Sequence, residues 1–159
     1  MGVSGSGKTT VGRLLADRIG ARFIDGDDFH LASNIEKMSA GEPLTDADRL
    51  PWLGELSDVL ARESNVVLAC SALKNTYREI LARAGKVVFV YLKADRDVAK
   101  KRVADRTDHF ASPALIESQF ATLEEPDQRH AILIDASDSP ERIASTIHDR
   151  LTFVECRSE

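Results

Sequence analysis

The residues at the start of the chain have the types and the spacing of a phosphate-binding loop. The pattern G-x-x-x-x-G-K-[ST] is matched at every position by Gly2, Val3, Ser4, Gly5, Ser6, Gly7, Lys8 and Thr9. In such a loop (P-loop) the backbone N–H groups surround phosphate oxygens, the lysine ammonium neutralises the β- and γ-phosphates, and the hydroxyl binds Mg²⁺. We therefore expect this loop and Thr10 to bind a nucleotide, with Lys8 in a catalytic role and Thr9 as a metal ligand.

A glycine-rich turn can also match this pattern by chance. Against that alternative, Val11, Leu15 and Ile19 recur at helical spacing directly after the loop, and Gly20 is a suitable residue to end a helix. A helix that begins at the loop points its N-terminus at the phosphates, as phosphate binding requires.

A second group of chemically capable residues is the acidic turn of Asp25, Gly26, Asp27 and Asp28. A hydroxyl that accepts a phosphoryl group needs an oxygen base nearby, and Mg²⁺ needs hard oxygen ligands. Two carboxylates one residue apart can divide these roles. Taken alone, D-G-D-D is equally typical of a structural turn, so the functional interpretation depends on the neighbouring P-loop.

The elements that must position these residues alternate along the chain. Apolar runs predict buried strands at residues 23–24, 66–70, 87–92 and 132–134, and amphipathic stretches predict helices at 8–20, 51–62, 74–83, 95–106 and 140–151. This alternation predicts an α/β fold in three layers, with a mostly parallel sheet that binds ligands at the carboxyl ends of its strands.

The position of the P-loop predicts that the sheet lacks its first strand. A P-loop normally follows a buried strand, yet only Met1 precedes Gly2. In this architecture that strand lies in the sheet centre, between the strands at 66–70 and 87–92. Without it, apolar burial is lost and backbone groups stay unpaired. We therefore expect a shortened form of a longer kinase, with low stability and weak activity.

Two longer segments interrupt the alternation. Long insertions in a compact domain are usually binding loops or lids. We expect an acceptor-substrate segment at about 27–50 and a lid at about 107–126, both within a single domain that spans residues 1–159.

Composition restricts the other partners. The formal net charge of −5 argues against nucleic acid, and no apolar run approaches the roughly twenty residues that a membrane span needs. Cys70 and Cys156 are too few for a disulfide framework or a zinc site, which favours the cytoplasm.

Further motifs resemble those of the bacterial gluconate kinase family. They are D-G-D-x-F-H from Asp25, N-I-x-K-M from Asn34, G-x-P-L-x-D-x-D-R-x-P-W from Gly41, C-S-A-L-K-x-x-Y-R from Cys70, R-x-x-x-R-x-x-H-F from Arg102 and S-Q-F-x-T-L-E from Ser118. The resemblance runs from Gly2 to about Asp135. It implies a fold similar to that of shikimate kinase, and transfer of the γ-phosphoryl group of ATP to the 6-hydroxyl of D-gluconate. It also implies Mg²⁺ and a homodimer.

The resemblance implies roles for individual residues. Asp27 would orient the acceptor hydroxyl and act as its base, Asp25 would hold a Mg²⁺-bound water, and Arg49 would bind the acceptor carboxylate in bidentate fashion. The other pocket residues would be His30, Lys74 and Arg78.

These pocket residues also have structural alternatives. Arg49 would form an exposed ion pair with Asp46 or Asp48, His30 would be a structural histidine, and Arg78 would be a solvated helix residue.

Arg102 and Arg106 lie four residues apart and therefore share one helix face. The resemblance implies that Arg102 stacks on adenine and that Arg106 reaches the transferring phosphate. A solvated basic face shared with Lys100 and Lys101 is the alternative.

One departure concerns the metal, because Cys70 and Ser71 stand where many P-loop enzymes carry a metal-binding aspartate. Two other functions stay open: a kinase for another small carboxylate or sugar acid, and a nucleotide-binding protein whose turnover is impaired by the shortened N-terminus.

Overall fold

Two pairs of parallel strands form the centre of the computed structural model, which describes residues 1–105 and 113–155. β1 (Arg22–Asp25) pairs with β2 (Val66–Ala69), and β3 (Val90–Lys93) pairs with β4 (Ile132–Asp135). Both registers are parallel, as the continuous apolar runs predict.

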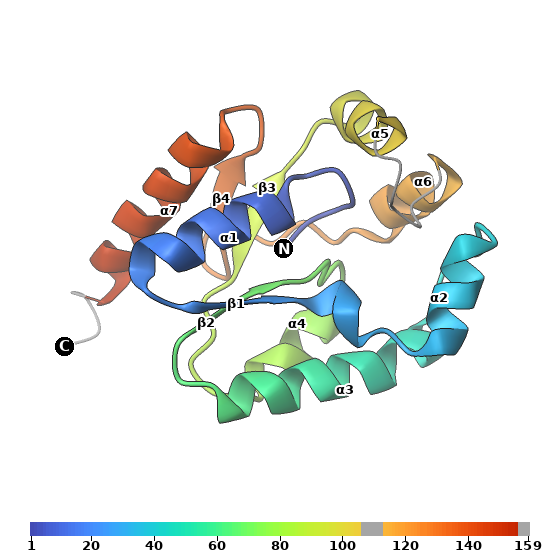
Figure 1. Cartoon of the computed structure of the whole chain (residues 1–159), viewed down its shortest axis with the longest axis horizontal. Coiled ribbons are helices and arrows are strands. Elements are labelled where there is room, and N and C mark those ends of the chain that lie inside the picture. Colours follow the sequence, from blue (N-terminus) through green and yellow to red (C-terminus); the bar gives the residue numbers. More distant parts are fainter. Residues whose placement is uncertain (106–112, 156–159) are drawn as a thin grey trace.

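Helices cover both faces of these strands, so the predicted three-layer α/β fold is confirmed (Figure 1). α1 (Lys8–Ile19) and α7 (Pro140–Glu155) pack on one face, and α3 (Asp46–Arg62) and α4 (Asn75–Ala82) pack on the other. The remaining elements are η1 (Gly26–Phe29), α2 (Ala32–Ser39), α5 (Arg96–Ala104) and α6 (Pro113–Thr122). None of the described helices has the length and apolar character needed to cross a membrane.

Each helical layer has its own apolar core. On one side, Val11 and Leu15 of α1 pack with Leu92 of β3 and Ile147 of α7. On the other side, the buried side chains of α3 and α4 meet beneath β2. They are Trp52, Leu53, Leu56, Tyr77 and Leu81.

The two strand pairs are not joined to each other within the described residues. A cavity of about 480 Å³ lies between them, and residues 66–70 and 86–90 line its two sides. Met1 occupies one end of the gap. Its nitrogen donates to the Val90 carbonyl at 2.6 Å and its carbonyl accepts from the Leu92 N–H at 3.0 Å, which is the bonding of a residue in a parallel strand. Apart from this one residue, the described part of the chain places no strand between β2 and β3, as predicted.

Some predicted boundaries were wrong. β3 begins at Val90, because residues 87–89 border the cavity and join β4 through a single bond, from the Ile132 N–H to the Phe89 carbonyl. α3 begins at Asp46, because Thr45 and Asp48 form a capping box that starts the helix ahead of Pro51. Helix α2 lies in the predicted acceptor-substrate segment, and helix α6 lies in the predicted lid segment.

Candidate active site

The P-loop curves between β3, α5 and the start of α1. Gly5 has φ 79°, and a Cβ atom there would lie 2.5 Å from the Ala99 carbonyl oxygen of α5. Gly7, at the N-cap of α1, has φ 92°. Both positions therefore need glycine, so the two residues set the course of the loop and keep it open to a ligand.

Cationic side chains lie on this loop. Lys8 Nζ donates to the Val3 carbonyl oxygen at 3.0 Å. Arg102 donates to the Gly5 carbonyl at 3.3 Å and to the Ala136 carbonyl at 3.2 Å. Arg102 therefore lies at the edge of the predicted nucleotide site, where it joins the P-loop to the turn after β4. Thr10 is exposed on α1.

The acidic turn lies directly beside the P-loop. The Thr9 hydroxyl donates to Asp25 Oδ2 at 2.9 Å, and Asp25 Oδ1 accepts from the Asp27 N–H at 3.2 Å. Asp25 thus caps η1 and leaves the Asp27 side chain 58% exposed. The two predicted metal residues and the predicted acceptor carboxylate form one cluster at the carboxyl end of β1.

His30 lies behind this cluster. Its ring stacks on Trp52 with the ring centres 4.2 Å apart, and its Nε2 is 3.8 Å from Asp27 Oδ1. Burial lowers the pKa of His30 and nearby Arg49 lowers it further, whereas Asp27 acts in the opposite direction. His30 Nδ1 is buried and has no hydrogen-bond partner among the described residues.

Arg49 is on the first turns of α3, with its guanidinium over the ring of Tyr77 at 5.9 Å. Asp46 accepts hydrogen bonds from Lys74 at 2.8 Å and from the Tyr77 hydroxyl, and these bonds lower the pKa of Asp46. Asp48 accepts from Lys37 at 2.7 Å, a bond that helps to hold its pKa at about 2. Neither ion pair considered for Arg49 is present among these described residues, so its guanidinium makes no direct contact with the Asp46 or Asp48 carboxylate, although its charge acts on Asp46 from a distance.

Arg78 is not the solvated helix residue of the structural alternative. Its side chain is buried and donates to the carbonyls of Ala72, Leu73 and Glu124 at 2.9 to 3.1 Å. Ala72 has φ 44°, which makes it the one described non-glycine residue with positive φ. The described bonds of Arg78 are internal, and they stabilise this strained turn.

Other residues bear on the site in ways that the sequence did not indicate. Asp46 holds Lys74 and Tyr77, and Trp52 donates to the Gly26 carbonyl at 2.7 Å, which fixes the acidic turn to α3. The longer motif G-x-P-L-x-D-x-D-R-x-P-W from Gly41, which contains both Asp46 and Trp52, was the available signal. Arg106 lies outside the described residues, as does residue range 107–112 of the predicted lid.

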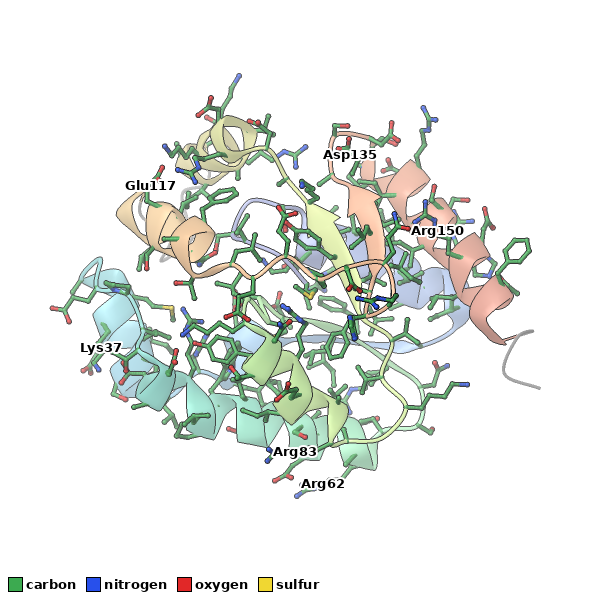
Figure 2. All side chains as sticks on the ribbon, turned by 180° about the vertical axis from the view of Figure 1, so that it is seen from behind. Lys37, Arg62, Arg83, Glu117, Asp135 and Arg150 are labelled. Carbon is green, nitrogen blue, oxygen red and sulfur yellow. The ribbon has the colours of Figure 1, made fainter. Side chains whose placement is uncertain are left out.

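The acceptor and lid segments lie at the same end of the molecule. Figure 1 shows α2 and α6 beyond the P-loop, at the end to which β1 runs, and Figure 2 shows Lys37 of α2 and Glu117 of α6 on that side. The sites implied for the nucleotide and the acceptor therefore meet at one edge of the strands.

Comparisons with known proteins show which family the chain resembles along most of its length. The family model described as shikimate kinase matches residues 4–152. A probable gluconokinase of Mus musculus is 47% identical over 148 residues, which cover 79% of this chain and 80% of the relative. The thermoresistant gluconokinase of Escherichia coli strain K12 is 43% identical over 155 residues, which cover 92% of this chain and 89% of the relative.

A solved structure gives the same result in three dimensions. The crystal structure of a gluconokinase from Sinorhizobium meliloti 1021 superposes with a TM-score of 0.84 and 39% identity, covering 96% of this chain and 93% of that chain. The similarity thus extends from sequence to the arrangement of the elements.

Proposed function

This chain belongs to the gluconokinases of the shikimate kinase family, and we propose that it transfers the γ-phosphoryl group of ATP to the 6-hydroxyl of D-gluconate. The products are 6-phospho-D-gluconate and ADP. The observation that carries the proposal is the hydrogen bond between Thr9 and Asp25, because it holds a carboxylate-bearing turn against the loop that would bind the phosphates.

In the proposed nucleotide site, the P-loop N–H groups and Lys8 bind the β- and γ-phosphates. The contact between Lys8 and Val3 keeps the ammonium at the loop that would bind the phosphates. Charge that grows on the β–γ bridging oxygen is then stabilised by the ammonium. In this proposal Arg102 stacks on the adenine ring. Arg106, which lies outside the described residues, would contact the transferring phosphate.

The residues present fit a magnesium ion. Thr9 Oγ1 is a hard oxygen donor for this cation, and Asp25 Oδ2, 2.9 Å from it, would hold a metal-bound water. No group of three or more metal-binding side chains occurs among the described residues, so phosphate oxygens and water complete the proposed coordination. When bound, the ion neutralises phosphate charge.

In the proposed acceptor site, Asp27 receives the hydrogen bond of the 6-hydroxyl and takes its proton as the oxygen attacks the γ-phosphorus. The bond from that phosphorus to the β–γ bridging oxygen breaks, and ADP leaves. Asp27 suits this role because it is exposed beside Asp25 and the P-loop.

Arg49 is our candidate for the gluconate carboxylate. A guanidinium binds a planar carboxylate through two parallel hydrogen bonds, and Arg49 is not paired with Asp46 or Asp48. Lys74 and His30 flank the sugar chain in this arrangement. We leave Arg78 out of the proposed contacts, because its guanidinium is buried in internal bonds.

A coupled assay of ADP release tests the proposal. The panel contains D-gluconate, other sugar acids, shikimate and D-glucose, with Lys8→Ala as the inactive control. We expect turnover with D-gluconate and none with D-glucose, which has no carboxylate. Preference for another acid would assign a different kinase activity, and ATP binding without turnover on any acid would assign a nucleotide-binding protein. The cytoplasmic location and the homodimer stay predictions.

A further inference from the structure

Gln119 of α6 makes a two-point contact with the P-loop that the proposed chemistry does not use. The Ser4 N–H donates to Gln119 Oε1 at 2.7 Å, and Gln119 Nε2 donates to Ser4 Oγ at 3.1 Å. An amide that accepts at one end and donates at the other has one orientation that satisfies both bonds. The contact therefore fixes Ser4 in position and in rotation.

Ser4 is a critical place for such a contact. It is the third residue of the P-loop and precedes Gly5, whose φ of 79° favours glycine. On the other side, Arg102 holds the Gly5 carbonyl. Gln119 thus supplies the side-chain restraint on the α6 side of the loop.

The residues that follow Gln119 are bonded to the acceptor side of the site. The Glu124 N–H donates to the Leu73 carbonyl at 2.9 Å, and a Glu124 carboxylate oxygen accepts from the Asn75 N–H at 2.7 Å. Arg78 donates to the Glu124 carbonyl at 2.9 Å. Residues 119–124 therefore connect the P-loop to the start of α4, where Lys74 and Tyr77 are located.

We propose that Gln119 is a positioning residue that holds the P-loop at a fixed position relative to the acceptor side of the site. It acts through Ser4 and bears on the distance between the γ-phosphorus and the acceptor oxygen. This inference rests on the proposed kinase function. A small error in that distance slows transfer to the acceptor much more than it weakens ATP binding, because binding is spread over many loop contacts.

The test compares Gln119→Ala with Thr122→Ala, a control on the same helix whose hydroxyl bonds only to the Ser118 carbonyl in the described structure. For Gln119→Ala we expect kcat to fall about tenfold or more, with the KM for ATP changed less than about threefold. The fraction of ATP hydrolysed by water rises relative to the fraction transferred to gluconate. Thr122→Ala keeps all three values near those of the wild type.

Amide exchange of Ser4 in the nucleotide-free protein supplies a readout that does not depend on activity. The Ser4 N–H is protected in the wild type and in Thr122→Ala, and it exchanges faster in Gln119→Ala. Gln119→Glu keeps an oxygen acceptor and loses the donor, so it retains protection of Ser4 even where the alanine variant is too unstable to measure. Normal kcat and a normal hydrolysis ratio, together with faster exchange at Ser4, would overturn the positioning role.

Failure of the proposed function gives a different result. If the wild type phosphorylates another acid, the same ratio is measured with that acid. If it phosphorylates none, the proposed function fails, and an unprotected Ser4 amide in the wild type would separately overturn the contact with Gln119.

Discussion

The Thr9 hydroxyl and the Asp25 carboxylate share a 2.9 Å hydrogen bond that joins the P-loop helix to the end of β1. The other carboxylate oxygen of Asp25 accepts the Asp27 N–H. One side chain therefore connects a residue proposed to hold the metal with a residue proposed to receive the acceptor hydroxyl. A change at Asp25 is expected to disturb both.

Asp25→Asn should weaken magnesium binding. The carboxamide keeps an oxygen for one of the two bonds but loses the negative charge that attracts the cation. We expect the Mg²⁺ concentration for half-maximal activity to rise about tenfold or more, the usual effect of losing an outer-shell carboxylate. A magnesium titration of kcat measures this. Asp28→Asn, an exposed residue in the same turn, is the control, and equal Mg²⁺ dependence of the two variants would contradict the assignment.

Asp27→Asn should lower kcat and leave ATP affinity unchanged. The change removes a base and an orienting acceptor without altering the P-loop, and loss of such a group costs about 10²-fold or more in rate. Turnover with saturating gluconate, together with ATP binding by calorimetry, separates the two effects. Near-normal kcat would transfer the role of base to Asp25 or remove it from the mechanism.

Arg49→Ala should raise the KM for gluconate about tenfold or more, because the carboxylate loses a charge-assisted bidentate partner. Arg49→Lys keeps the positive charge but loses the planar pair of N–H donors. Its KM for gluconate should therefore lie between those of the wild type and the alanine variant. Arg62→Ala, at the other end of α3, is the matched control (Figure 2). Unchanged discrimination between gluconate and glucose would show that Arg49 does not bind the carboxylate.

His30 should make folding stability depend on pH. Burial lowers its pKa, so in the window from the folded-state pKa up to about 6.5 the unfolded chain binds a proton that the folded chain does not. Stability is therefore complete above about pH 6.5 and declines as the pH falls through this window. Urea unfolding from pH 5 to 7.5 measures the slope. His30→Gln should reduce this slope, and an unchanged slope in that variant would contradict the role of His30.

A strand placed in the gap between β2 and β3 should stabilise the protein. An apolar segment of roughly eight to twelve residues, enough for a strand and a lead-in, fused ahead of Met1 would continue the parallel bonding that Met1 makes with Val90 and Leu92. Each large side chain buried in the cavity contributes roughly 1.5–3 kcal/mol, so we expect a clear rise in melting temperature together with higher turnover. An extension of equal length with two central prolines is the control. Equal melting temperatures for the two extensions would show that the gap accepts no strand.

Much of this fold could be predicted from the sequence because its signals are local. The P-loop pattern and the apolar runs indicated α1, the parallel strands and the gap in the sheet centre, since each depends on residues adjacent in the chain. The start of α3 differs from the prediction, because Thr45 and Asp48 cap the helix ahead of Pro51.

The pairing of side chains across the site was harder to predict. Asp46 bonds to Lys74 and Tyr77, and Gln119 bonds to Ser4, over separations in the chain that no periodicity encodes. Arg78 appeared able to contact a ligand on the pattern alone, yet the positive φ of Ala72 creates a turn whose carbonyl it binds. Such partners are set by packing, which a single sequence does not report.

Trp52 is the one tryptophan of the chain, and its indole is buried against His30 and hydrogen-bonded to Gly26. All intrinsic tryptophan fluorescence therefore comes from a single position directly behind the acidic turn. A protonated imidazole quenches a stacked indole, so the emission intensity reports the charge of His30. The same emission would follow any ligand that reorganises residues 25–30, so it offers an optical readout, without an attached dye, of the acceptor binding proposed for this turn.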